Sequence, residues 1–214
     1  MKPPNRSFLI AITGGIASGK TLFCQELVKK GFSVYYSDNI VHSILEEEKI
    51  RLKIIKNFGK EILDETGRIN RKLLGDLVFN NPGKLSVLNK IIHPEVRKKI
   101  QQIIDSSKEK YLFFEIPLLV EKGLQKAFDL TINIHADEKL RIERLLQGRA
   151  MDKVKAGKII RSQINSELRG EKTDLTIINN GELKMLFDQV DSLIEELRDF
   201  PFKTIVRITD INQQ

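Results

Sequence analysis

Gly14-Gly15-Ile16-Ala17-Ser18-Gly19-Lys20-Thr21 has the spacing G-x-x-x-x-G-K-T and directly follows the apolar run from Phe8 to Ile12. A strand, a glycine-rich loop and the start of a helix are the context that a phosphate-binding loop (P-loop) requires. The backbone N–H groups of such a loop form an anion site, to which the following helix adds its dipole. The alternative is an ordinary glycine-rich turn. We expect the loop, through Leu22, to bind ATP, with Lys20 between the β- and γ-phosphates and the Thr21 hydroxyl on Mg²⁺.

Apolar segments of strand length alternate with helical sequence along the chain. Continuous apolar runs bounded by turns are typical of buried parallel strands. Such alternation predicts an α/β fold, a P-loop NTPase three-layer sandwich whose parallel sheet is covered on both faces. The five expected strands are Phe8–Thr13, Phe32–Tyr36, Tyr111–Glu115, Leu130–Ile134 and Leu175–Asn179.

Two helical stretches are too long to be simple crossovers. We expect a core of residues 1–38, 108–140 and 173–200, a helical acceptor-binding subdomain at 39–107 and a lid at 141–172. In the subdomain, Pro82 and Pro94 predict the first turns of two successive helices. An amphipathic helix is expected from Leu183 to Phe200, and the tail, 201–214, contains a possible edge strand, Thr204–Ile208.

Composition limits the classes of protein to which this chain can belong. The 214 residues carry a net charge of +7, contain no Trp and 3 Tyr, and show no Lys/Arg run interleaved with aromatics. Phosphorylated ligands therefore explain the basic charge better than nucleic acid does. No apolar run approaches the ~18 residues of a membrane span, and nothing targets secretion. The single Cys24 is expected to be a small buried residue, and we expect a cytoplasmic monomer or weak homo-oligomer without membrane or nucleic-acid partners.

Ligands bind open α/β sheets beyond the carboxyl ends of the strands, so polar residues at that edge are candidates. Asp38 could orient an acceptor hydroxyl and take its proton, or it could cap the helix that follows. Glu115 could reach Mg²⁺ or form an ordinary ion pair. His93 could bind substrate, with Arg97 one turn later, or cap or pack against a helix. Lid arginines such as Arg144 and Arg149 could stabilise the transferred phosphoryl group or form a solvated basic face.

Taken together, the motifs resemble those of the dephospho-CoA kinase family, from about Leu9 to Leu197. The loop from Ile12 to Thr21 is similar to T-G-G-I-x-S-G-K-[ST]. The other matching segments, in the family's order, are Val34–Asp38 for D-A-D, Glu65–Arg71 for D-G-x-[IL]-x-R, His93-Pro94 for H-P, Ile116–Glu121 for P-L-L-[FV]-E, Gln163 for a lid glutamine, and Asp174 with Ile177–Gly181 for A-D-x-x-I-D-N-x-G.

The resemblance implies transfer of the ATP γ-phosphoryl group to the ribose 3′-hydroxyl of dephospho-CoA, the last step of coenzyme A biosynthesis. It implies that Asp38 is the base and that the acceptor contacts Asp38, Arg71, His93, Arg97, Pro117 and Leu118. The chain departs from the family pattern at Tyr36, at Ile178 and at Gly148-Arg149-Ala150. The last departure leaves open whether Arg144 or Arg149 is the lid arginine.

Two other classes remain open from the residues themselves. The first is another P-loop small-molecule kinase, of the nucleoside monophosphate kinase type, which would differ only in its acceptor. The second is a P-loop regulator or nucleic-acid-binding switch, against which the chain lacks the guanine signature N-K-x-D.

Overall fold

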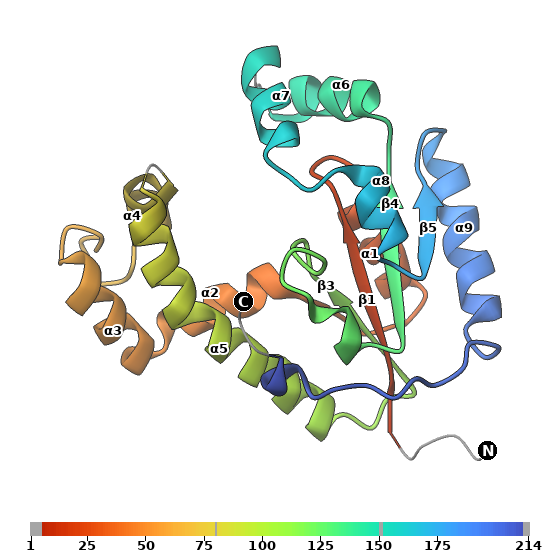
Figure 1. Ribbon diagram of the computed structural model, residues 1–214, viewed down its shortest axis with the longest axis horizontal. Coiled ribbons are helices and arrows are strands. Elements are labelled where there is room, and N and C mark those ends of the chain that lie inside the picture. The colour runs from red at the N-terminus through yellow and green to blue at the C-terminus, as the bar shows by residue number, and fades with distance from the viewer. Residues whose placement is uncertain (1–5, 80, 150–151, 212–214) are drawn as a thin grey trace. The chain divides into compact units, whose positions relative to one another are not determined.

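The computed structural model describes residues 6–79, 81–149 and 152–211 (Figure 1). Its contacts divide the chain into two compact units. The first, the core unit, comprises residues 1–36 and 107–214, and the second, the helical unit, comprises residues 37–106.

The core unit is built on a five-stranded sheet in which every pairing is parallel. The strands are β1 (Phe8–Gly14), β2 (Val34–Tyr36), β3 (Tyr111–Glu115), β4 (Leu130–His135) and β5 (Leu175–Ile178), in the order β2-β3-β1-β4-β5. Every residue of the central strand β1 is buried, as expected of a strand covered on both faces. The predicted α/β fold with a five-stranded parallel sheet is therefore confirmed.

Two helices cover one face of the sheet (Figure 1). They are α1 (Lys20–Lys29) and α9 (Leu183–Glu196), which pack against each other. Their apolar sides meet the inward-facing residues of β1, β3 and β4, and the buried residues at this interface include Ile12, Phe23, Cys24, Leu27, Phe113, Ile132, Leu186, Val190 and Leu193. Cys24 is a fully buried free cysteine, as the sequence predicts, and burial strongly raises its pKa.

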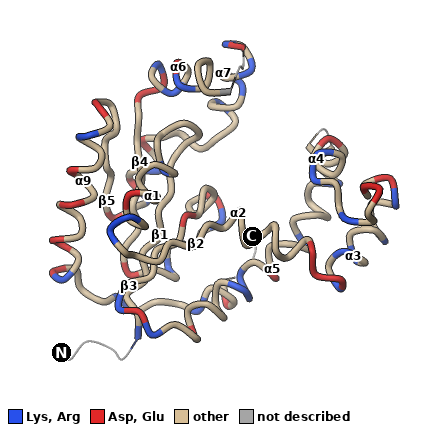
Figure 2. The backbone as a smooth tube through the Cα atoms, turned by 180° about the vertical axis from the view of Figure 1, so that it is seen from behind, with Lys and Arg blue, Asp and Glu red and all other residues tan. Residues whose placement is uncertain are grey.

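Shorter elements of the core unit follow β3 and β4. Residues 116–123 lead to the 3-10 helix η1 (Leu124–Ala127), and α8 (Ser166–Glu171) packs on β4. Between β4 and α8 lie α6 (Glu138–Arg149) and α7 (Lys153–Arg161), which carry many of the basic residues (Figure 2). Leu145, Ala156 and Ile160 form a small core between these two helices, against which Ile16 and Ala17 of the P-loop pack.

The helical unit contains α2 (Ser37–Glu46), α3 (Glu48–Phe58), α4 (Arg71–Phe79) and α5 (Pro82–Ser106). The helix α5 packs against the other three through residues that include Leu88 and Ile92. The prediction of two successive helices is wrong, because α5 continues through Pro94. Proline removes only one helical hydrogen bond, so burial of apolar residues on both sides of Pro94 can hold the helix together.

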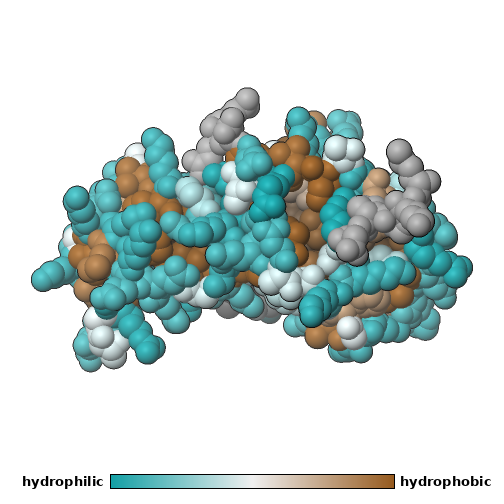
Figure 3. All heavy atoms as spheres, turned by 90° about the horizontal axis from the view of Figure 1, so that it is seen from below, coloured by the Kyte–Doolittle hydropathy of each residue, from teal (hydrophilic) through white to brown (hydrophobic). Residues whose placement is uncertain are grey.

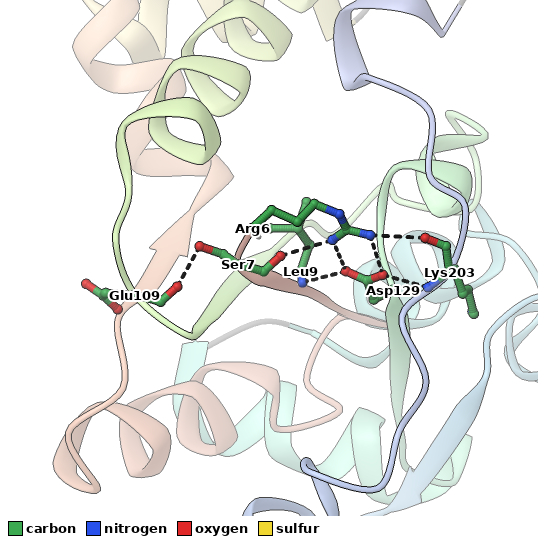
Figure 4. A network of polar contacts seen from close by, with 6 residues as sticks. All are labelled: Arg6, Ser7, Leu9, Glu109, Asp129 and Lys203. Atoms are coloured by element: carbon green, nitrogen blue, oxygen red, sulfur yellow. Dashed lines mark hydrogen bonds and ion pairs between the residues drawn. The ribbon is translucent and has the colours of Figure 1, made fainter. Parts of the chain in front are cut away.

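The tail crosses the edge of the sheet where β1 begins. Arg6 donates two hydrogen bonds to the buried carboxylate of Asp129, at 2.6 and 2.8 Å, and the same carboxylate accepts from the backbone N–H groups of Leu9 and Lys203 (Figure 4). The predicted edge strand Thr204–Ile208 is wrong. One backbone hydrogen bond joins Val206 to the Lys126 carbonyl, and the 3-10 helix η2 (Ile208–Asp210) follows.

Hydrophilic side chains surround separate apolar patches on the face shown in Figure 3. In the described ranges, none of the helices has both the length and the apolar character of a membrane-spanning segment.

Candidate active site

The P-loop lies between the end of β1 and the start of α1. Ala17 has a left-handed conformation, with φ of 59°, and the Ser18 amide donates to the Gly15 carbonyl at 3.2 Å. At Gly19, φ is 100°, and a Cβ atom would lie 2.1 Å from the Asn179 side-chain nitrogen. Only glycine satisfies both the backbone conformation and the close approach of Asn179. Thr21 and Leu22 follow in the first turn of α1 and are exposed.

Lys20 lies against the backbone of the loop. Its ammonium group donates to the carbonyl oxygens of Gly14 and Gly15, at 2.9 Å each. Burial lowers the pKa of Lys20 to about 8, with the positive charges of Arg169 and Arg141 acting in the same direction and Glu115 acting against them. An anion next to this ammonium would restore its charge, so the site favours binding of phosphate.

Residues 141–172, predicted to form a lid, contact the loop through Arg141 and Gln163. Arg141 donates from Nε to the Ile16 carbonyl at 2.8 Å, and its Nη2 donates to the Gln163 side-chain oxygen at 3.0 Å. The same oxygen accepts from the Ile16 amide at 2.9 Å. A Cβ atom at Gly15 would lie 2.5 Å from the Arg141 guanidinium, so the second glycine of the motif gives that side chain its space.

Arg144 also reaches the loop. It donates to the Ala17 carbonyl at 3.3 Å and to the Asn179 carbonyl at 3.0 Å, while Asn179 donates from Nδ2 to the Ser18 carbonyl at 2.8 Å. Of the two arginines proposed for the lid, the structure thus brings Arg144 to the P-loop. Arg149 is the last residue of α6, and its side chain lies outside the described residues.

The end of β3 lies beside the same loop. Glu115 pairs with Ile12 of β1 and Tyr36 of β2, and its charge raises the pKa of Lys20. The Pro117 carbonyl accepts from the Thr13 hydroxyl at 3.1 Å, and Leu118 is exposed. Pro117, after β3, and Asn179, after β5, thus each contact the segment formed by β1 and the P-loop.

The remaining candidates belong to the helical unit. Asp38 is the second residue of α2, which follows β2 without a break, so the capping role is wrong and Asp38 is an exposed first-turn residue. His93 and Arg97 lie inside α5, one turn apart and half-buried, so His93 does not cap a helix either. Burial lowers the pKa of Arg97.

Arg71 begins α4 and lines a cavity of about 600 Å³ within the helical unit. Its guanidinium contacts the His42 ring. Arg51 and Arg68 also line this cavity, together with the carboxylates of Glu46 and Asp64. The cavity therefore offers three guanidinium groups to a ligand, which makes it suited to a phosphorylated one.

Two arginines of the core unit were not among the candidates. Arg141 stands three residues before Arg144, so the two share a face of α6, and this spacing is a signal that could have indicated its role. Arg169 is fully buried on α8 and pairs with Glu121 at 2.8 Å. Nothing in the sequence around Arg169 distinguishes it from the other basic residues of the lid.

Comparisons with known proteins place this chain in a family. The model of a family described as dephospho-CoA kinase matches residues 8–185. The chain belongs to the dephospho-CoA kinase family. The dephospho-CoA kinase of Fusobacterium nucleatum is 38% identical over 189 residues, covering 88% of this chain and 98% of the relative, and that of Leifsonia xyli is 35% identical over 195 residues, covering 89% and 98%.

Solved structures show the same architecture. The dephospho-CoA kinase of Campylobacter jejuni has a TM-score of 0.69 at 30% identity, covering 89% of this chain and 97% of its own. The protein TT1252 of Thermus thermophilus has a TM-score of 0.78 at 27% identity, covering 90% and 98%. A shikimate kinase of Acinetobacter baumannii, at 14% identity and a TM-score of 0.50, covering 93% and 97%, shares the fold alone.

Proposed function

We propose that this enzyme transfers the γ-phosphoryl group of ATP to the ribose 3′-hydroxyl of dephospho-CoA, which gives CoA and ADP in the final step of coenzyme A biosynthesis. Membership of the family supports this acceptor. The observation that carries the phosphoryl-transfer chemistry is the P-loop, where Lys20 lies on the loop carbonyls and Arg141 and Arg144 lie over the same backbone. Phosphoryl transfer depends on positioning and positive charge, which this arrangement supplies.

In this proposal the loop residues from Gly14 to Leu22 bind ATP, and Lys20 spans its β- and γ-phosphates. Arg144 is the lid arginine that the contacts favour, with Arg149 as a second candidate. The lid residues also exclude water, which would otherwise compete with the acceptor for the reactive phosphate.

Mg²⁺ is part of the same proposal. In the described parts of the chain, no three His, Cys, Asp or Glu side chains cluster as a metal site. Mg²⁺ that is bound together with a nucleotide takes one or two protein oxygens and completes its shell with phosphates and water. The Thr21 hydroxyl and the Glu115 carboxylate would hold the ion, which neutralises charge on the phosphates when bound.

For the acceptor, we propose that Asp38 takes the proton from the 3′-hydroxyl as that oxygen bonds to the γ-phosphorus. The bond from this phosphorus to the β,γ-bridging oxygen breaks, and ADP leaves. Arg71, His93, Arg97, Pro117 and Leu118 would contact the acceptor. The arginines that line the cavity of the helical unit support an acceptor that itself carries phosphate groups.

We also propose a cytoplasmic enzyme that works as a monomer or weak homo-oligomer, without nucleic acid or a membrane. Its single cysteine, buried and unpaired, is compatible with a reducing compartment.

An acceptor panel tests the proposed function. The purified chain is given ATP and Mg²⁺ with dephospho-CoA, AMP, CMP or no acceptor, and ADP formation and the phosphorylated product are both measured. We expect rapid transfer to dephospho-CoA alone. Preferred transfer to AMP or CMP would establish a nucleoside monophosphate kinase instead, and hydrolysis that does not depend on any acceptor would contradict a kinase role.

A further inference from the structure

Arg169 is the largest fully buried side chain of the described residues, and only part of its guanidinium group has a partner there. Its Nη2 atom pairs with the Glu121 carboxylate at 2.8 Å, while Nε and Nη1 are buried without a hydrogen-bond partner in the described structure. A buried charged group with unsatisfied donors is costly. The two free donors therefore indicate that an acceptor from outside the polypeptide binds at this position.

A second buried polar group lies next to Arg169. The Asn133 side chain is fully buried, and both its oxygen and its nitrogen are without a partner among the described residues. Its Nδ2 atom lies 3.7 Å from where a Cβ of Gly170, the residue after Arg169, would stand. In the sheet, Asn133 pairs with Thr13, the residue directly before Gly14 of the P-loop. The unsatisfied polar atoms thus extend from α8 toward the start of the loop.

The charges in this region are predominantly positive. Arg169 is close enough to Lys20 and to Arg141 for its charge to lower the pKa of both. Lys20 and Arg141 in turn contact the loop backbone between Gly14 and Ile16. Three cations therefore lie near one end of the P-loop, against two carboxylates, Glu121, which pairs directly with Arg169, and Glu115, whose charge raises the pKa of Lys20. An anion is the ligand that would balance this excess.

From these contacts we propose that Arg169 is a phosphate-binding residue, held in place by Glu121, whose free guanidinium donors bind the terminal phosphate of the bound nucleoside triphosphate. The backbone N–H groups of the loop serve the inner phosphates, and Lys20 lies between the β- and γ-phosphates. Arg169 then adds a guanidinium charge and free N–H donors at the phosphate that is transferred. This inference rests on the proposed function only in that a triphosphate occupies the loop.

Nucleotide binding without an acceptor tests the inference. Dissociation constants are measured by titration calorimetry, with Mg²⁺, for ADP and for the non-hydrolysable β,γ-imido analogue of ATP. In Arg169→Met, we expect the analogue to bind about tenfold more weakly or worse, while ADP stays within about twofold of the original protein. A role in folding alone would not distinguish the two nucleotides.

Two further variants keep the result decisive. The double variant Arg169→Met with Glu121→Gln removes both charges, so it leaves no unpaired buried carboxylate and replaces the single variant if that one does not fold. The matched control is Arg198→Met, which removes an exposed arginine whose side chain is 79% accessible, and both affinities should stay unchanged. Equal weakening of ADP and the analogue, or no weakening of either, would overturn the proposal. Because no acceptor is present, the outcome does not depend on whether dephospho-CoA is the substrate.

Discussion

Asn179 donates a hydrogen bond from its side-chain nitrogen to the carbonyl oxygen of Ser18 at 2.8 Å. Both residues are buried, so the segment after β5 holds the P-loop from the side of α9. This contact is possible because Gly19, between Ser18 and Lys20, has no side chain at the point where the Asn179 amide passes.

Gly19→Ala should therefore disrupt the loop. The new Cβ would meet the Asn179 nitrogen at 2.1 Å, at a φ of 100° that already strains any other residue. We expect a lower melting temperature and a loss of ATP affinity of about tenfold or more. Gly31→Ala is the matched control, because Gly31 has a φ of 91° with nothing within 4 Å, and it should cost stability but not ATP affinity. Equal ATP affinities in the two variants would refute the role of the Asn179 contact.

The pKa of Lys20, about 8 against an ordinary 10.5, predicts a dependence of stability on pH. Between these two values the unfolded chain binds more protons at Lys20 than the folded one, so this group makes the free energy of unfolding rise with pH. Below the lower value, both states are protonated and the contribution of Lys20 to the slope vanishes. Lys20→Met should lack this rise. Urea unfolding of both proteins from pH 7.5 to 10 measures the difference, and parallel curves would contradict the lowered pKa.

Nucleotide binding should take up a proton at the same lysine. Phosphate restores the charge of the ammonium group, so above about pH 8 binding of ADP should be accompanied by proton uptake. Calorimetry in buffers of different ionisation enthalpy measures this uptake. We expect it to be absent at pH 7, and Arg198→Met, which alters an exposed arginine, should behave as the unaltered protein does.

Asp38→Asn tests the proposed base. The substitution keeps the size of the side chain but removes its ability to accept a proton, so turnover should fall by about 100-fold or more while ATP affinity is unchanged. Asp76→Asn, at another exposed aspartate of the helical unit, is the control and should retain full turnover. If the Asp38 variant keeps near-normal turnover, Asp38 has no catalytic role and serves only the first turn of α2.

Asp129→Asn should destabilise the core unit without touching the P-loop. The carboxylate accepts hydrogen bonds from N–H groups of Arg6, Leu9 and Lys203. The asparagine side chain would place its own NH₂ donor against some of these N–H groups, so hydrogen bonds would be lost. We expect a loss of about 2 to 4 kcal/mol in the free energy of unfolding. Asp188→Asn breaks the exposed pair with Lys184 and should cost less than about 0.5 kcal/mol. Denaturant titration of both variants measures the difference, and similar losses would show that burial of Asp129 is unimportant.

The sheet could be predicted from sequence because buried parallel strands carry continuous apolar runs. The expected strand Tyr111–Glu115 agrees with the structure at both ends, and the others agree to within two residues. Pro94 and the segment Thr204–Ile208 led to wrong predictions for a different reason. Whether a helix passes through a proline, or an apolar segment pairs as a strand, depends on contacts with residues distant in sequence.

The residues of the candidate site likewise divide into those that a local motif predicts and those whose role depends on the fold. The P-loop was evident because its motif is local, and Arg144 was among the candidates. Arg141 and Arg169 were missed, because residues 141–172 are rich in basic side chains throughout and only the fold decides which of them reach the loop or become buried. The catalytic roles of Lys20 and Asp38 remain predictions, which the substitutions above test.

The attachment of the carboxyl-terminal segment at Asp129 has a practical consequence for anyone producing this protein. The family match ends at residue 185, and α9 ends at Glu196, so either boundary looks like a natural place to trim an expression clone. Trimming there would delete Lys203 along with Phe202, whose ring packs edge-on against Phe8 at 5.1 Å. The ring of Phe8, at the start of the strand that leads into the nucleotide loop, would lose this packing, and the Asp129 carboxylate would lose one of its four hydrogen bonds. Purified material would then be expected to aggregate.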